Sequence, residues 1–287
     1  MTASASGDAA FCADLVRSRD FTSYAASLFV PPAPRRAWLA LAAFSSEVSH
    51  VRDHVSQALT GEIRLQWWRD ALTGHAGGSV QGDVTGNPVA AELLRAIKEY
   101  KLPVESFIRL IDAHVFDVYD DPMPDIAALE AHCRDTSAAL YALRARTLGV
   151  TSPEVARISD HAGIAEGLVD VMLALPRHSA RRQLYLPADL MNLHDVIAED
   201  VFMQKSDEPL RQALAHLRQE ARKQLDTAFA LMGNAPAAAR PAFLPLVMMQ
   251  LILSKLEASS PFNPPSMSRL ATLWTIWRAA SRSPFRN

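Results

Sequence analysis

Residues Gly163 to Pro187 have the sequence GIAEGLVDVMLALPRHSARRQLYLP, and this stretch decides the predicted fold. Gly163 and Gly167 lie four positions apart, and so do Glu166 and Asp170. Residues at that spacing share one face of an α-helix. We therefore predict a helix that carries two acidic side chains on one side and approaches a neighbouring helix closely at its glycines.

Apolar residues recur at helical spacing along the rest of the chain as well, while strict alternation over the length of a strand is scarce. Segments rich in Gly, Pro, Asn and Ser separate the periodic stretches and leave about eight helices. The sequence therefore predicts an all-α fold. The helical spacing is clear at Leu93, Leu94, Ile97, Phe107, Leu110 and Ile111.

Length and composition restrict the organisation of the chain and its partners. The 287 residues contain no Gly/Ser-rich linker, so we expect one large domain. The net charge of -2 gives no overall attraction to nucleic acid, and we expect no nucleic-acid partner. Cys12 and Cys133 are the two cysteines, and we predict unpaired thiols in a cytoplasmic protein. The apolar stretch at residues 241–253 is too short to span a membrane and is predicted to be a buried helix.

A set of ordered motifs carries a family resemblance. The motifs are Asp20, Tyr24, Leu28-Phe29, Pro31, Arg36, Leu41-Ala42-Ala43-Phe44, Gly61, Arg64-Leu65, Trp67-Trp68 and Tyr185-Leu186-Pro187. On these residues the chain resembles the squalene/phytoene synthase family over nearly its whole length. The resemblance implies an isoprenoid-synthase-like helical bundle at residues 20–257, preceded by an N-terminal extension at 1–19 and followed by a basic amphipathic segment at 258–287.

The resemblance also implies a magnesium site, which this chain has largely lost. In the family, two Asp-x-x-x-Asp motifs on facing helices bind magnesium, because Mg²⁺ requires hard oxygen ligands that it can share with a diphosphate. The flanking residues place the first motif at Ser49 to Asp53 and the second at Ala174 to His178. Of the four expected aspartates only Asp53 remains, and Pro176 is expected to bend the second helix. We therefore predict no metal and no cofactor.

Other carboxylates are candidates to replace the missing ligands. Glu166 and Asp170 lie two helical turns before the second motif, and as a buried pair they would need cationic partners, for which Arg52 and Arg64 are the candidates. Asp117 and Asp121 have the same spacing, but they precede Pro122 and are interpreted as solvated charges. The candidate residues of a central cavity are Asp53, Arg52, Arg64, Glu166, Asp170 and Tyr185.

The degenerate motifs, at positions Ser49, Asp53, Ala174 and His178, suggest a function without catalysis. They resemble those of the non-catalytic branch of the family, which contains the mitochondrial complex I assembly factor and its bacterial relatives. The resemblance implies a pseudo-enzyme whose partners are subunits or assembly intermediates of respiratory complex I. Two alternatives remain open: an active transferase acting on farnesyl or geranylgeranyl diphosphate with Mg²⁺, and a protein that binds a prenyl lipid or quinone.

The C-terminal segment at residues 268–287 is basic and amphipathic. Arg269, Arg278, Arg282 and Arg286 occur there without an acidic residue, and Leu270, Leu273, Trp274 and Trp277 fall on one helical stripe. One interpretation is a terminal helix that packs on the bundle. The other is peripheral contact with an anionic surface, which would place the protein at the inner membrane.

Overall fold

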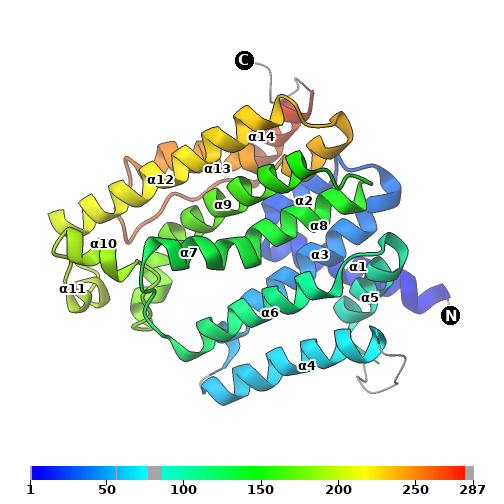
Figure 1. The fold of residues 1–287 in the computed structure, drawn as a ribbon, viewed down its shortest axis with the longest axis horizontal. Helices are drawn as coiled ribbons and strands as arrows, with labels where there is room; N and C mark the ends of the chain where they lie inside the picture. The colour runs from blue at the N-terminus through cyan, green and yellow to red at the C-terminus, as the bar shows by residue number, and fades with distance from the viewer. Residues whose placement is uncertain (1, 56, 77–85, 282–287) are drawn as a thin grey trace.

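The computed structural model describes residues 2–55, 57–76 and 86–281, and these ranges consist of helices joined by loops and turns (Figure 1). Within them β pairing is limited to an isolated bridge between Ser260 and Asn263, so the all-α prediction is confirmed. The helices are α1 (Thr2–Arg19), α2 (Phe21–Ser27), α3 (Pro32–Ser49), η1 (Arg52–His54), α4 (Ala58–Ala76), α5 (Pro88–Tyr100), α6 (Val104–Tyr119), α7 (Ile126–Cys133), η2 (Arg134–Ala138), α8 (Ala139–Thr147), α9 (Pro153–Ala180), α10 (Ala188–Leu193), α11 (Ala198–Phe202), α12 (Glu208–Met232), η3 (Ala237–Phe243), α13 (Leu246–Leu256) and α14 (Arg269–Ser281).

The described chain contains more helices than the eight that periodicity predicts. Local caps start new helices inside segments that look continuous in the sequence. The carboxylate of Asp20, for example, accepts a hydrogen bond from the backbone N–H of Ser23 and separates α2 from α1. Such a cap satisfies one of the free N–H groups at a helix start, so a short helix can begin without a break in the apolar pattern.

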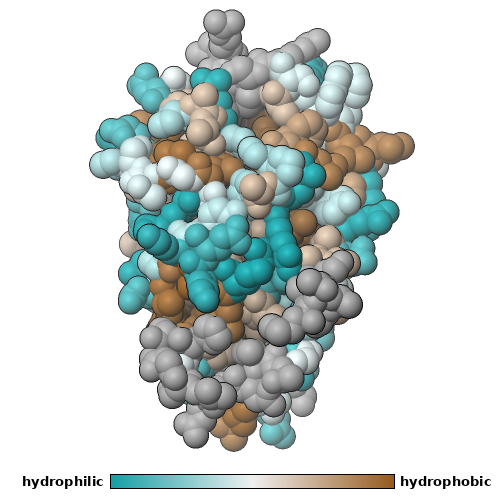
Figure 2. Space-filling model, turned by 90° about the vertical axis from the view of Figure 1, so that its right-hand side faces the viewer, coloured by the Kyte–Doolittle hydropathy of each residue, from teal (hydrophilic) through white to brown (hydrophobic). Residues whose placement is uncertain are grey.

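The side chains form two apolar cores. One is built around α9, α12 and α13, and the other around α1, α3, α4, α5 and α6. The segment predicted as an N-terminal extension belongs to the second core: α1 packs on α3 and α5, and Cys12 and Val16 are completely buried. Figure 2 views the end of the molecule where α1 and α5 lie, on which a hydrophilic band separates apolar patches.

The glycines of α9 permit the close approach that the sequence predicts. A Cβ atom at Gly163 would lie 2.1 Å from the backbone nitrogen of Ala138, and one at Gly167 would lie 2.3 Å from Sγ of Cys133. The contacted segment contains η2, a π-helical turn between α7 and α8. This widened turn is packed directly against the helix that carries Glu166 and Asp170.

Residues 241–253 are largely buried in the first core, as predicted, in η3 and α13. Within the described ranges no single helix has the length and hydropathy to cross a membrane, and η3 with α13, bent by 40°, meets that test only as a pair. Cys12 and Cys133 are both free, buried thiols, which confirms that they are unpaired.

Candidate functional site

A cavity of about 630 Å³ lies where the two apolar cores meet. Its wall is formed by α3, α6, α7, α8, α9 and α13, so that the segments carrying both degenerate motifs face it. The lining is half polar and half apolar. Its ionisable side chains are Arg19, Asp20, His50, Arg52, Asp53, His114, Asp117, His132, Cys133, Arg144, Glu166, Asp170, Arg177, His178 and Tyr185.

The first degenerate motif does not form one helical face. Helix α3 ends at Ser49, and Asp53 lies in the short 3-10 helix η1. The i and i+4 positions of this motif therefore do not project from the same face, as they would in a continuous helix. Ser49 is exposed, and its hydroxyl lies 3.1 Å from Nδ1 of His50.

The second degenerate motif lies near the end of α9. The helix continues through Pro176 as far as Ala180, so the proline does not terminate it. Burial, the largest influence, lowers the pKa of His178 to about 4. Its imidazole is therefore neutral at physiological pH, and its ring lies 4.6 Å from that of Tyr185. Ala174 also lines the cavity and has no ligand atom to offer.

An ion pair joins the two motifs directly. Nη1 of Arg177 donates to Oδ2 of Asp53 at 3.2 Å, and Nη1 of Arg181 donates to Oδ1 of the same carboxylate. Burial raises the pKa of Asp53, but the hydrogen bond from Arg181 and the charge of Arg177 more than offset it, and the net pKa lies below its ordinary value. The one remaining motif carboxylate is thus ionised and already neutralised by guanidinium groups.

Glu166 and Asp170 both face the cavity from α9, as predicted. Their depth in the protein is the main cause that raises both pKa values, and the charge of Glu166 raises that of Asp170 further. The guanidinium of Arg144 partly offsets this effect at Glu166. Asp170 lies deep in the protein, yet its side chain is exposed to the open space of the cavity. The two acids therefore share a tendency to bind protons.

The predicted partners of these acids are wrong. Arg52 lines the cavity, but its guanidinium binds Asp120 in a bidentate manner, with distances of 3.0 and 2.5 Å. Arg64 does not line the cavity and lies instead at a separate hollow of about 300 Å³ beside Trp67 and Trp68. The residue next to Glu166 is Arg144, which is 1% exposed.

Arg144 was missed because its sequence signal is weak. It is one of two arginines near the end of helix α8, where long side chains usually reach solvent. In the structure its guanidinium lies 4.7 Å from the ring centre of Trp38, and Nη2 donates to Oγ of Ser23 at 2.8 Å. These partners lie more than a hundred residues earlier in the chain, so no local pattern reveals them.

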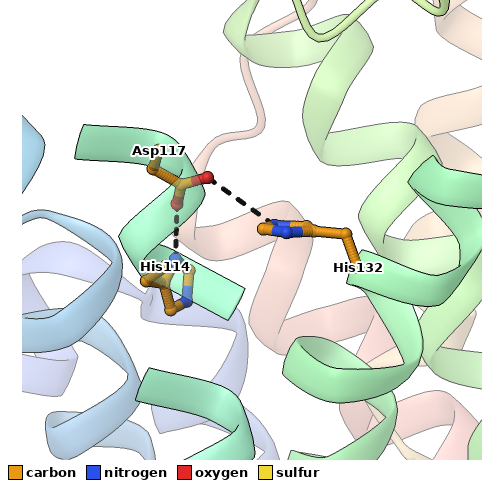
Figure 3. A group of neighbouring side chains, drawn as sticks. All are labelled: His114, Asp117 and His132. Carbon is orange, nitrogen blue, oxygen red and sulfur yellow. Dashed lines mark hydrogen bonds and ion pairs between the residues drawn. The ribbon is translucent and has the colours of Figure 1, made fainter. Parts of the chain in front are cut away.

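The prediction that Asp117 is exposed to solvent is also wrong. The sequence interpretation placed it among solvated charges before Pro122, but the side chain is buried and faces the cavity with His114 and His132 (Figure 3). Burial raises its pKa, but the charge and hydrogen bond of His114 bring the net pKa below its ordinary value. Asp121, its partner in the Asp-x-x-x-Asp pattern, is exposed as predicted.

Tyr185 occupies the cavity wall as the sequence predicts. Its side chain is mostly buried, and its hydroxyl accepts a hydrogen bond from Nε2 of Gln183 at 3.2 Å. Burial is the main cause that raises its pKa, with the charge of Asp117 adding to it. The phenol therefore stays neutral.

The degenerate motif positions do not fit the magnesium ions that the fold family implies. Mg²⁺ requires several oxygen ligands in near-octahedral geometry. Ser49, Ala174 and His178 supply no carboxylate, and the carboxylate of Asp53 is bound by two guanidinium groups. No magnesium-dependent step is therefore assigned to these residues.

The comparisons with known proteins agree with the fold and with the sequence motifs. A family model described as squalene/phytoene synthase matches residues 16–273. The chain is 33% identical over 247 residues, covering 86% of this chain and 73% of its relative, to the complex I assembly factor 6 of Rattus norvegicus. It is 25% identical over 214 residues, 74% of this chain and 75% of the relative, to a presqualene diphosphate synthase of Rhodopseudomonas palustris.

A solved structure shares the architecture. The squalene synthase of Alicyclobacillus acidocaldarius superimposes with a TM-score of 0.77 over 92% of this chain and 98% of its own. The sequence identity of the pair is 23%, so this likeness concerns the fold.

Proposed function

This chain belongs to the squalene/phytoene synthase family, and from that premise we propose that it is a non-catalytic member that supports the assembly of respiratory complex I. The relatives at 30–33% identity carry the name of a complex I assembly factor, whereas the relative named as a presqualene diphosphate synthase is 25% identical. Its partners would be subunits or assembly intermediates of complex I.

The ion pair between Asp53 and Arg177 carries the non-catalytic part of this proposal. These two residues belong to the two segments that bind magnesium in catalytic members, and here they bind each other. A guanidinium binds carboxylates and phosphates through hydrogen bonds and charge, but it does not coordinate oxygen atoms of both in one shell as Mg²⁺ does. The cavity is thus retained without the metal ligands that the prenyl-transfer chemistry requires.

Incubation of the protein with farnesyl diphosphate and Mg²⁺ tests the loss of catalysis. We expect no release of inorganic diphosphate above the rate without protein. The matched variant is Asp170→Ala, because Asp170 is a cavity carboxylate one turn before the second degenerate motif and is a candidate ligand for Mg²⁺. Diphosphate release by the wild type that Asp170→Ala abolishes would show that the protein is a working transferase.

Rescue of complex I in cells that lack the gene tests the assembly role. We expect the amount of assembled complex I on native gels to fall in these cells and to return with the wild-type protein. Asp170→Ala should restore it equally well, because the proposed role uses the folded surface and not turnover. Normal complex I in the deleted cells would contradict the proposal, and rescue by the wild type but not by folded Asp170→Ala would favour the transferase.

We further propose that α14 makes peripheral contact with an anionic membrane. The helix packs on α2 and α13 through the buried side chains of Thr272 and Ile276. Its outer face nevertheless exposes Leu270, Trp274 and Trp277, which are 80%, 62% and 50% exposed. Basic residues beside exposed aromatic side chains are typical of interfacial helices. Arg282 and Arg286 lie outside the described residues.

Sedimentation with vesicles of phosphatidylcholine and a phosphatidylserine fraction tests this contact. The double variant Trp274→Ala/Trp277→Ala should bind at least threefold less protein than the wild type. Ile63→Ala is the matched control, since Ile63 is 61% exposed on α4 and should be neutral. Equal sedimentation of the wild type and the double variant would remove the proposal.

The cavity is also suited to hold a lipid. Apolar side chains such as Leu173, Met249 and Ile252 line it together with arginine and histidine, which fits a molecule with an apolar tail and an anionic or polar end. We propose a prenyl lipid or quinone. Extraction of the purified protein followed by mass spectrometry should then yield one such lipid in near-stoichiometric amount, and protein free of lipid that fails to take up added quinone would contradict this.

A further inference from the structure

Two histidines and a carboxylate converge on one wall of the cavity (Figure 3). His114 and Asp117 lie three positions apart on α6, and His132 lies near the end of α7. One ligand atom from each lies within 4.8 Å of those of the other two. Nδ1 of His114 is 2.5 Å from Oδ2 of Asp117, and Nε2 of His132 is 3.9 Å from Oδ1. Each carboxylate oxygen thus faces a different imidazole.

The hydrogen bonds in this cluster leave one carboxylate oxygen without a partner. Asp117 is 8% exposed, and among the described residues no donor meets hydrogen-bond geometry at its Oδ1, although the hydroxyl of Tyr185 lies close enough to lower the pKa of the carboxylate. A buried carboxylate oxygen without a partner is rare in folded proteins and requires an explanation. The backbone oxygen of Asp117, by contrast, accepts a hydrogen bond from Nε2 of Gln183 at 3.1 Å. The unsatisfied atom is therefore the one that points toward His132.

We propose that His114, Asp117 and His132 bind a divalent late first-row transition metal of the Zn²⁺ class. Two imidazoles and one carboxylate are a common ligand set for such ions, and an open position toward the cavity would remain for water or a small ligand. Magnesium is disfavoured because two of the three ligands are nitrogen atoms. The site does not depend on the assembly role and differs from both degenerate motifs.

The distances are compatible with a small adjustment on binding. Ligand atoms bound to Zn²⁺ at 2.0–2.1 Å in tetrahedral geometry lie about 3.3 Å apart. The observed separations of 2.5 and 3.9 Å fall on either side of that value. Both separations lie within about 1 Å of that value, and the three ligand atoms lie within 4.8 Å of one another, so small side-chain shifts would bring them toward one ion.

Neighbouring residues support the cluster. Gln183 supports the site from behind, because its Nε2 contacts both the backbone oxygen of Asp117 and the hydroxyl of Tyr185. The π-helical turn η2 begins two residues after His132, and such turns are frequent at functional sites.

Titration calorimetry with ZnCl₂ on the full chain, treated first with a chelator, tests the site. We expect one saturable Zn²⁺ per chain. His132→Ala and Asp117→Asn should each weaken it at least tenfold. His50→Ala is the matched control, because His50 lines the same cavity outside the cluster and should bind Zn²⁺ as the wild type does. Far-UV circular dichroism checks that each variant remains helical.

A measurement on the wild type alone keeps the test decisive even where a variant fails to fold. Loaded with Co²⁺, the protein should show paramagnetically shifted NMR signals from the imidazoles of two histidines. No saturable Zn²⁺ binding, affinity unchanged in folded His132→Ala and Asp117→Asn, or a Co²⁺ spectrum without two histidine ligands would each overturn the proposal.

Discussion

Two groups of carboxylates in the cavity have been neutralised in different ways. Asp53 is ionised and bound by Arg177 and Arg181 from the end of α9. Glu166 and Asp170, two turns earlier on the same helix, have raised pKa values and retain protons more readily. The positive charge beside Asp53 belongs to Arg177, whose side chain is partly exposed to solvent. The positive charge that acts on Glu166 belongs to Arg144, which is fully buried.

This difference shows two ways in which carboxylates in a cavity are neutralised without a metal ion. A carboxylate that loses a metal partner must bind another cation or a proton, because an isolated charge is costly inside a protein. Asp53 is bound by two arginines at the end of α9, where their long side chains remain partly exposed to solvent. At the inner pair the charges of Arg144 and Arg177 do not offset the effect of burial, so both acids retain raised pKa values.

The largest expected effect comes from removing the inner cation. Arg144→Met should lower the free energy of unfolding by about 3 kcal/mol, because it leaves Glu166 without its buried counter-charge and removes the contact with the ring of Trp38. Urea denaturation followed by circular dichroism measures this loss. Arg146→Met, on the same helix, should cost less than about 0.5 kcal/mol. Similar losses in both variants would show that Arg144 has no special role.

An intermediate effect is expected at Asp170, and it depends on pH. Because the folded-state pKa of Asp170 is raised above that of the unfolded chain, its contribution to stability is complete below about pH 4 and is lost as the pH rises through the folded pKa. Asp170→Asn cannot ionise. Its urea midpoint should therefore exceed that of the wild type by an amount that grows between pH 5 and pH 8.

The control for this experiment is Asp160→Asn, since Asp160 is an exposed acid on the same helix. The difference between its urea midpoint and that of the wild type should not grow with pH. A gain in Asp170→Asn that is constant with pH would mean that charge on the acid is not the cause.

The smallest effect is expected at Asp53. Asp53→Asn should cost at most about 1 kcal/mol at pH 7, because Arg177 and Arg181 are partly solvated and exposed ion pairs contribute little. The folded pKa of Asp53 is lowered, so its contribution is present above the unfolded pKa and is lost as the pH falls through the folded one. The difference from the wild type should therefore shrink below about pH 4. If Asp53→Asn remains less stable than the wild type at lower pH, the loss of stability comes from altered packing and not from the lost charge.

Much of the cavity could be predicted from motifs, and the errors have a common physical origin. Asp53, Ala174 and His178 were placed by their neighbours in sequence, and Gly163 and Gly167 showed where another helix would pack. The structure places Asp53, Ala174 and His178 in the cavity wall. Those predictions succeeded because each depends on local spacing along the chain.

The errors concern the partners of charged side chains. Arg64 was assigned to the cavity and lies elsewhere, and Asp117 was assigned to solvent and is buried. Charged residues are usually exposed, so composition alone argues against burial. Whether a particular carboxylate is buried depends on which distant helix covers it, and for Asp117 the covering residues include His132 and Gln183.

The sequence by itself determined that the chain forms an all-α bundle of the squalene/phytoene synthase family and that three of its four motif aspartates are missing. Helical periodicity and motif order are properties of neighbouring residues, so they can be recognised without knowledge of how the helices pack. Only the tertiary structure decided which cation neutralises which acid and brought His132 to Asp117. These contacts join residues from separate helices, and their energies depend on distance and burial, which are set when the helices pack.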